Sequence, residues 1–315
     1  MLKFVIKRLL AAIPTIIVTF TFVFIVVRII PGDAAYIVLG EEATLEEIAA
    51  WRAANGLDDP IIVQYLNWFA NVFKGDLGDS LINRQPVVQN ILMYIEPTVL
   101  LVLMSNFIAV ILGIPAGVIS ALKRDSWVDK TLMTASMIGV ATPSFWLGLM
   151  LCLWFAVQNK WFPATGYKNI EVAGLWVSMK HLFLPALSLG VQRTASIARF
   201  TRSCMLDVLR SDYVRTARAK GVGEFVVTMK HMLRTTMGPV ITTIGLGIAQ
   251  SFGGALVTER VFNIPGIGLL AYNSISTRDQ PQIQAIIVYV AMVYIVINII
   301  LDILYKYFDP RIQLD

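Results

Sequence analysis

The sequence predicts an all-α fold, a polytopic transmembrane helical bundle of six spans, from three observations. Of the 315 residues, 57% are hydrophobic and only 15% are charged, whereas about a quarter of a soluble domain is charged. The apolar residues gather into long runs without Asp, Glu, Lys or Arg, and a helix of about 20 such residues crosses a bilayer core. Lysine and arginine concentrate in alternate loops, as the positive-inside rule requires.

The apolar runs make one transmembrane domain over residues 1–315. We expect the spans at about residues 9–29, 98–122, 132–157, 182–200, 237–258 and 281–304. The first follows basic residues as a secretory signal does, but its apolar run is longer than a signal's, so we expect it to be retained. Arg193 interrupts the fourth span. Pro115 and Pro143 lie inside the second and third, where proline can bend a helix.

Basic residues set the orientation of the chain. From Arg199 to Arg234 there are eight basic residues against three acids. The segment of residues 31–96 has the opposite balance, with ten acids against three basic residues. Both termini are therefore expected in the cytoplasm and the 31–96 segment outside. The net charge of +5 follows from the same rule and does not indicate a nucleic-acid partner.

The 31–96 segment is too long for a simple connection between spans. Thr44 and Glu47 have the spacing of a capping box, which predicts a helix over Leu45–Ala54. A second helix is expected after Pro60, and it holds Gln64, Tyr65, Trp68 and Phe73. The segment is either a small folded cap over the bundle or a docking surface for an external partner.

The sequence lacks the residues of several kinds of site. It has no Gly-rich phosphate-binding loop, and His181 and His231 are too far apart for a HExxH-type metal site. Cys152 and Cys204 are expected at different depths, so neither a disulfide nor a metal site is expected. We expect no catalytic residue. The spans are almost free of acids, which argues against a proton-driven pump, so energy must come from another chain.

The segment of residues 200–236, between the fourth and fifth spans, is basic and has an amphipathic pattern. Some of its apolar residues fall at i, i+3, i+7 and i+11, the spacing of one helical face. They are Leu206, Leu209, Tyr213 and Ala217. Gly221 and Gly223 are expected to break this helix before a second one. Two short helices around a glycine turn favour a docking site for another protein over a merely solvated loop.

The stretch Asp212–Gly221, with Lys230–Arg234 and Pro239–Thr242 after it, resembles the coupling loop of ABC-transporter permeases. It is most similar to the first permease of importers for dipeptides, oligopeptides and nickel. Other stretches resemble this family in the same order. They are Ile30–Asp33, Gly56–Pro60, Gln64-Tyr65, Gly75–Gly78, Gly113–Gly117, Pro143–Gly148, Phe262–Gly268 and Asp309–Ile312. The general motif begins Glu-Ala-Ala, where this chain has Arg215-Thr-Ala217, with Gly221 in register.

The resemblance implies the architecture of a type I ABC importer permease in a bacterial inner membrane. It implies a second homologous permease in a heterodimer, two ATPase subunits that bind ATP and Mg²⁺, and an external substrate-binding protein. The chain itself would bind no cofactor. The residues expected to couple to the ATPase are Tyr213, Arg215, Thr216, Ala217, Arg218, Ala219, Lys220, Gly221, His231 and Arg234.

Polar residues inside spans tend to face the bundle interior, so they are candidates for the transport path. They are Asn106, Thr142, Ser144, Gln192, Arg193 and Gln250. Each can instead bond one helix to another, and Arg193 can instead reach the inner membrane surface. A peptide is the expected substrate, with nickel, glutathione and oligosaccharide as alternatives. A secondary transporter is a more remote alternative, because the sequence shows neither inverted repeats nor charged midplane residues.

Overall fold

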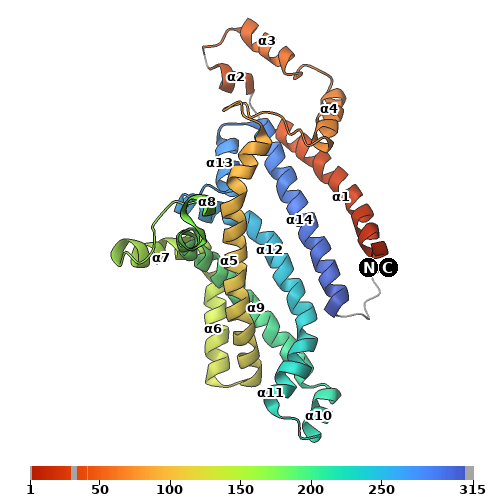
Figure 1. Cartoon of the computed structure of the whole chain (residues 1–315), viewed down its shortest axis with the longest axis vertical. Helices are drawn as coiled ribbons and strands as arrows, with labels where there is room; N and C mark the ends of the chain where they lie inside the picture. Colours follow the sequence, from red (N-terminus) through yellow and green to blue (C-terminus); the bar gives the residue numbers. More distant parts are fainter. Residues whose placement is uncertain (1, 30–33, 41, 309–315) are drawn as a thin grey trace. The chain divides into compact units, whose positions relative to one another are not determined.

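A computed structural model describes residues 2–29, 34–40 and 42–308 of the chain. Figure 1 shows that these residues form a succession of helices. The described ranges contain no β-strand, only an isolated bridge between Asp79 and Pro86. The Ile30–Asp33 and Asp309–Ile312 stretches lie outside the described residues. The all-α fold is therefore confirmed for the part of the chain that the structure describes.

The helices follow one another through short connections. In chain order they are α1 (Leu2–Ile29), α2 (Ala34–Leu39), α3 (Leu45–Ala54), α4 (Ile61–Phe73), α5 (Val87–Leu122), α6 (Trp127–Ala141), α7 (Ser144–Leu151), the π-helical η1 (Cys152–Gln158), α8 (Ile170–Ala173), α9 (Leu175–Leu209), α10 (Asp212–Ala219), α11 (Glu224–Val226), the π-helical η2 (Val227–Leu233), α12 (Arg234–Phe262), α13 (Ile267–Ser276) and α14 (Gln280–Phe308). They fall into two compact units. The first unit is residues 1–96 with 265–296, and the second is residues 97–264 with 297–315.

Three of the described helices, α1, α5 and α14, are long and apolar enough to cross a membrane. Two bent helix pairs bring the number to five if each pair is one span. The fourth expected span lies in α9, which is not among these helices. Six spans and cytoplasmic termini therefore stay predictions.

The third expected span, residues 132–157, is bent at Pro143, where the sequence predicts that a helix can bend. Helix α6 ends at Ala141, α7 begins at Ser144, and the two helices meet at 100°. Thr142 has the extended backbone (φ −80°, ψ 122°) that is typical of a residue before proline, and Pro143 follows it. At Pro115, by contrast, α5 continues without a break.

The first unit contains both helices predicted in the 31–96 segment. Helix α3 spans Leu45–Ala54 with its capping box, in which the Glu47 backbone N–H donates to the Thr44 hydroxyl. In return, the Thr44 backbone N–H donates to the Glu47 carboxylate at 2.9 Å, which lowers the pKa of that carboxyl. Helix α4 begins after Pro60, as predicted.

Helix α4 packs along α1 through aromatic and polar contacts. The rings of Phe24 and Tyr65 lie 5.2 Å apart, and Nη2 of Arg28 donates to Oε1 of Gln64 at 2.6 Å. Ile62, in the first turn of α4, is 69% exposed. The segment is therefore folded within the first unit, and both the cap and the docking surface stay predictions.

The end of the 31–96 segment is tied to the start of α14. The Ser80 hydroxyl and the Leu81 backbone N–H both donate to the buried carboxylate of Asp279. Nδ2 of Asn90 donates to Oε1 of Gln282 at 2.8 Å. Helix α5 begins at Val87 rather than near residue 98, so its first turns belong to this segment and not only to a span.

In the second unit, helices α5 and α9 approach so closely that only glycine fits between them. A Cβ atom on Gly117 would lie 2.6 Å from the carbonyl oxygen of Ala198, and one on Gly113 would lie 3.0 Å from Cβ of Ile197. Small residues four apart are typical of such helix contacts in membranes. Close packing of α5 on α9 therefore explains why glycine is needed at Gly113 and Gly117, which the family resemblance alone does not explain.

Candidate functional site

The 200–236 segment does not form the continuous helical face that the sequence predicts. Helix α9 ends at Leu209 and α10 begins at Asp212, with Ser211 in an extended conformation between them. This break changes the helical register, because the i+7 and i+11 spacing assumes one uninterrupted helix. As a result Tyr213 is 44% exposed, and Val214 is buried in its place beside Ala217.

Gly221 makes the predicted turn. Its φ of +74° lies in the left-handed region, which favours glycine. The Val222 N–H donates to the Ala217 carbonyl, and the Gly221 N–H donates to the Arg218 carbonyl. This pair of bonds is the Schellman motif, which satisfies the last carbonyls of a helix. Gly223 has an ordinary φ of −59°, so it does not need to be glycine for this reason.

Arg218 and Glu224 form an ion pair across the Gly221 turn. Nε and Nη2 of Arg218 donate to the two carboxylate oxygens of Glu224 at 2.7 and 3.2 Å. Both side chains are partly exposed, so the pair contributes only about 0–1 kcal/mol to stability. The sequence predicts Arg218 as a contact for another protein but not this pair, whose signal is opposite charge across a glycine turn.

The inner face of the segment packs on α5 and α9. The buried residues of this cluster are Val118, Ala121, Met205, Val214, Ala217, Val227 and Met232. Val118 and Ala121 belong to α5 and Met205 to α9, while the other four lie within residues 212–233. Residues 212–233, which we call the knob, are therefore seated on the ends of two long helices.

The outer face of the knob is basic and apolar at once. Of the ten predicted coupling residues, seven are exposed, Arg218 and His231 are half-buried, and Ala217 is buried. The exposed seven are Tyr213, Arg215, Thr216, Ala219, Lys220, Gly221 and Arg234. Phe225 is 77% exposed, and Val226 and Met229 are exposed beside it. None of these three is among the ten predicted coupling residues, although all three lie in the second short helix of the predicted docking site.

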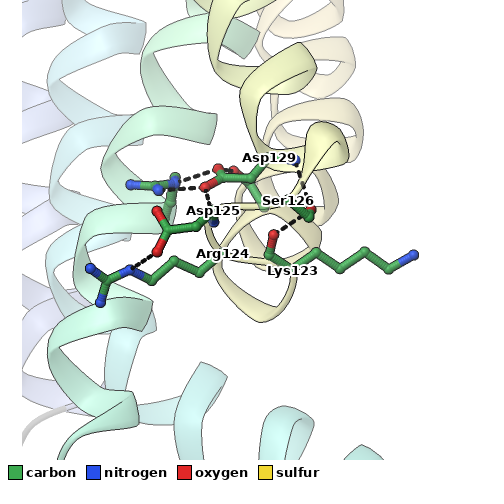
Figure 2. Close-up of polar contacts among 7 residues, drawn as sticks. Lys123, Arg124, Asp125, Ser126 and Asp129 are labelled. Carbon is green, nitrogen blue, oxygen red and sulfur yellow. Dashed lines mark hydrogen bonds and ion pairs between the residues drawn. The ribbon is translucent and has the colours of Figure 1, made fainter.

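An ion pair holds the turn between α5 and α6 to α9, and Figure 2 shows its buried acid, Asp129. Nε and Nη2 of Arg202, in α9, donate to the two carboxylate oxygens of Asp129 at 2.7 and 2.6 Å. Asp129 also accepts from the Ser120 hydroxyl and from the Asp125 backbone N–H. Its own N–H is capped by Ser126, which starts α6. The turn between α5 and α6 is thus held to α9, three residues before Met205.

The six polar candidates for the transport path fall into separate places. Asn106, Arg193 and Gln250 line one cavity of about 250 Å³ in the second unit. Nε2 of Gln192 instead donates to the carbonyl of Thr142 at 2.7 Å, where it satisfies the break between α6 and α7. Ser144 begins α7. Within the described residues no group of three or more His, Cys, Asp or Glu could hold a metal ion.

Comparison with known proteins identifies the family. Residues 113–314 match the family described as "Binding-protein-dependent transport system inner membrane component", and residues 1–102 match the N-terminal family of the same systems. Two matches in solved structures of the MetNI methionine ABC transporter, in inward-facing conformations, have TM-scores of 0.57 and 0.59 at 14% and 15% identity. Each covers 70% of this chain and 97% of the matched chain, and at this identity they show the fold alone.

Curated relatives are similar over nearly the whole length. The chain is 41% identical to a dipeptide transport system permease protein, DppB, of Alkalihalophilus pseudofirmus, over 99% of this chain and 100% of the relative. It is 42% identical to the glutathione transport system permease protein GsiC of Escherichia coli K12, over 99% of each chain. The chain belongs to the inner-membrane components of binding-protein-dependent transport systems, and it is a permease subunit of an ABC importer rather than an enzyme.

Proposed function

We propose that this permease imports peptides delivered by an external substrate-binding protein, with energy supplied by ATPase subunits that grip the knob. The exposed outer face of residues 212–233 is the main observation that supports binding of the ATPase at the knob. Phe225 exposes most of its ring beside basic residues of the same short segment. An exposed apolar cluster of this kind is typical of a protein contact.

The seating of the knob supports its role in coupling. Its inner face packs on Val118 of α5 and Met205 of α9. The Asp129–Arg202 pair holds the adjoining turn to the same helix α9. Because packed interiors transmit displacement rather than absorb it, a pull on the outer face would move both helices. ATP and Mg²⁺ would stay on the partner subunits, and this chain would bind no cofactor.

A peptide substrate is favoured by the two named relatives. One is a dipeptide permease and the other a glutathione permease, and both solutes contain amide bonds and free carboxylates. A nickel ion and an oligosaccharide share neither the amide bonds nor the free carboxylates of these two solutes. The substrate of this chain is therefore proposed to be a dipeptide or short oligopeptide, with glutathione as the second candidate.

The partners and orientation are proposed on the same grounds. Six spans would place both termini and the knob in the cytoplasm and the acidic 31–96 segment outside, where the binding protein docks. That segment and the start of α14 line a cavity of about 590 Å³, with Trp51, Asp76 and Arg84 among its walls. A second homologous permease would complete the path as a heterodimer.

Co-purification tests the coupling role directly. This chain would be purified in mild detergent from cells that also express the neighbouring transporter genes, and ATPase subunits would be measured by mass spectrometry. Phe225→Ala should lose most of the ATPase that wild type recovers. Trp176→Ala is the matched control, because Trp176 is equally exposed at 80% but lies outside the knob. Full ATPase recovery with Phe225→Ala would contradict the proposed contact.

A further inference from the structure

Three polar side chains from three helices converge on the 250 Å³ cavity of the second unit. Asn106 comes from α5, Arg193 from α9 and Gln250 from α12. We call this cavity the Arg193 pocket. It lies in stretches of these helices that are otherwise mostly apolar. Ionisable groups in such places are costly and usually serve a function.

The charge of Arg193 is not neutralised within the described part of the chain. Its Nη1 donates to Oε1 of Gln250 at 3.0 Å, and this partner is neutral. No carboxylate among residues 2–29, 34–40 and 42–308 forms an ion pair with it. Arg202, nine residues further along the same helix, has both oxygens of Asp129 instead. A guanidinium has five N–H donors, so most of those on Arg193 are available to a ligand.

The shape of the pocket keeps these donors accessible. Gly247 forms part of its wall, and a Cβ atom there would lie 3.6 Å from Nη1 of Arg193 and 3.9 Å from Oδ1 of Asn106. The glycine therefore leaves open the space in front of both groups. Nδ2 of Asn106 is held by the Val102 carbonyl and the Ser251 hydroxyl at 2.8 and 3.2 Å. This fixes the amide, so Oδ1 is left to accept a hydrogen bond.

We propose that the Arg193 pocket binds the free carboxylate of the transported solute, which makes Arg193 a residue that determines specificity. The guanidinium would hold the carboxylate through two parallel N–H···O bonds. Oδ1 of Asn106 would accept from the adjacent amide N–H of a peptide. The pocket would repel a metal cation and offer no charge partner to a neutral sugar. This inference rests on the proposed peptide transport and narrows it to solutes with a free carboxylate.

Uptake into proteoliposomes tests the site. The complete transporter would contain this chain, the second permease, the ATPase subunits and the binding protein. Labelled alanyl-alanine and alanyl-alaninamide would each be supplied at a concentration that saturates the binding protein. Arg193→Gln should slow uptake of the free acid about 10- to 150-fold, the range for losing a hydrogen bond to a charged group. It should leave uptake of the amide unchanged, and Arg193→Lys should restore part of the acid rate.

Arg199→Gln is the matched control, since it removes the same charge from an exposed position on the same helix. It should change neither rate. Unchanged acid uptake with Arg193→Gln would overturn the site alone, as would equal slowing of acid and amide. Loss of the second permease from the purified Arg193→Gln complex would show that Arg193 pairs with that subunit instead. Absence of wild-type uptake of both peptides would overturn the proposed function, and the site with it.

Discussion

At the scale of single residues, Gly221 and Gly223 lie two positions apart but have different roles. Gly221 has a positive φ, whereas Gly223 has an ordinary one. A Cβ atom on either would meet no other atom within 4 Å. Only the backbone conformation of Gly221 therefore demands glycine, and steric crowding demands it at neither position.

Gly221→Ala should therefore destabilise the turn by about 1–2 kcal/mol, the cost of a left-handed backbone for an L-residue. The knob should become more sensitive to limited proteolysis in detergent and recover less ATPase. Gly223→Ala is the control, since alanine adopts its conformation without strain. Equal proteolysis of the two variants would show that the Gly221 turn is not held as described.

The sequence was informative at this scale wherever the signal was local. The Gly221 turn and the Thr44–Glu47 capping box were both predicted and are both present. The exposure of Tyr213 was not predicted, because it depends on the two-residue break after Leu209. The Arg218–Glu224 pair was missed because the turn must form before the two charges meet.

At the scale of elements, the turn between α5 and α6 is defined by two neighbouring acids with different surroundings (Figure 2). Asp129 is buried and bonded to Arg202 through two N–H groups. The Asp125 side chain is 78% exposed and lies 3.1 Å from an exposed Arg124. Only the first pair joins α6 to α9.

Asp129→Asn should lower the midpoint of thermal unfolding in detergent, because Arg202 would lose its anion. We expect a loss of about 3 kcal/mol, at the low end for breaking a buried pair since Arg202 is partly exposed. Asp125→Asn should change stability by less than about 0.5 kcal/mol, as an exposed ion pair contributes little. If both variants unfolded at the wild-type temperature, the pair would not be the tie between α6 and α9.

Elements with a strong local signal were predicted well and long spans less so. Helices α3 and α4 begin where the capping pattern and Pro60 place them. The expected third span is bent by 100°. A charge-free run in the sequence indicates the length of an apolar segment but not the direction of its helices. Helix α5 starts before its expected span because polar contacts in the first unit, such as Asn90 with Gln282, extend it.

At the scale of the whole molecule, composition and charge distribution were enough to predict a helical membrane protein. The family followed from motifs spread along the chain, and the matches at residues 1–102 and 113–314 confirm it. The number of spans could not be settled in the same way. Helix α9 has polar residues such as Arg193 and Gln192 whose hydrogen-bond partners lie outside α9, and a hydropathy average does not take such partners into account.

The central claim, that this chain is the permease of a peptide importer, is tested most directly by uptake into proteoliposomes of the complete transporter. Labelled dipeptide, ⁶³Ni²⁺ and maltotriose would be offered in parallel, with and without ATP. We expect accumulation of the dipeptide that requires ATP and the binding protein, and no accumulation of the other two. ATP-driven accumulation of nickel or of the sugar, without the dipeptide, would contradict the claim.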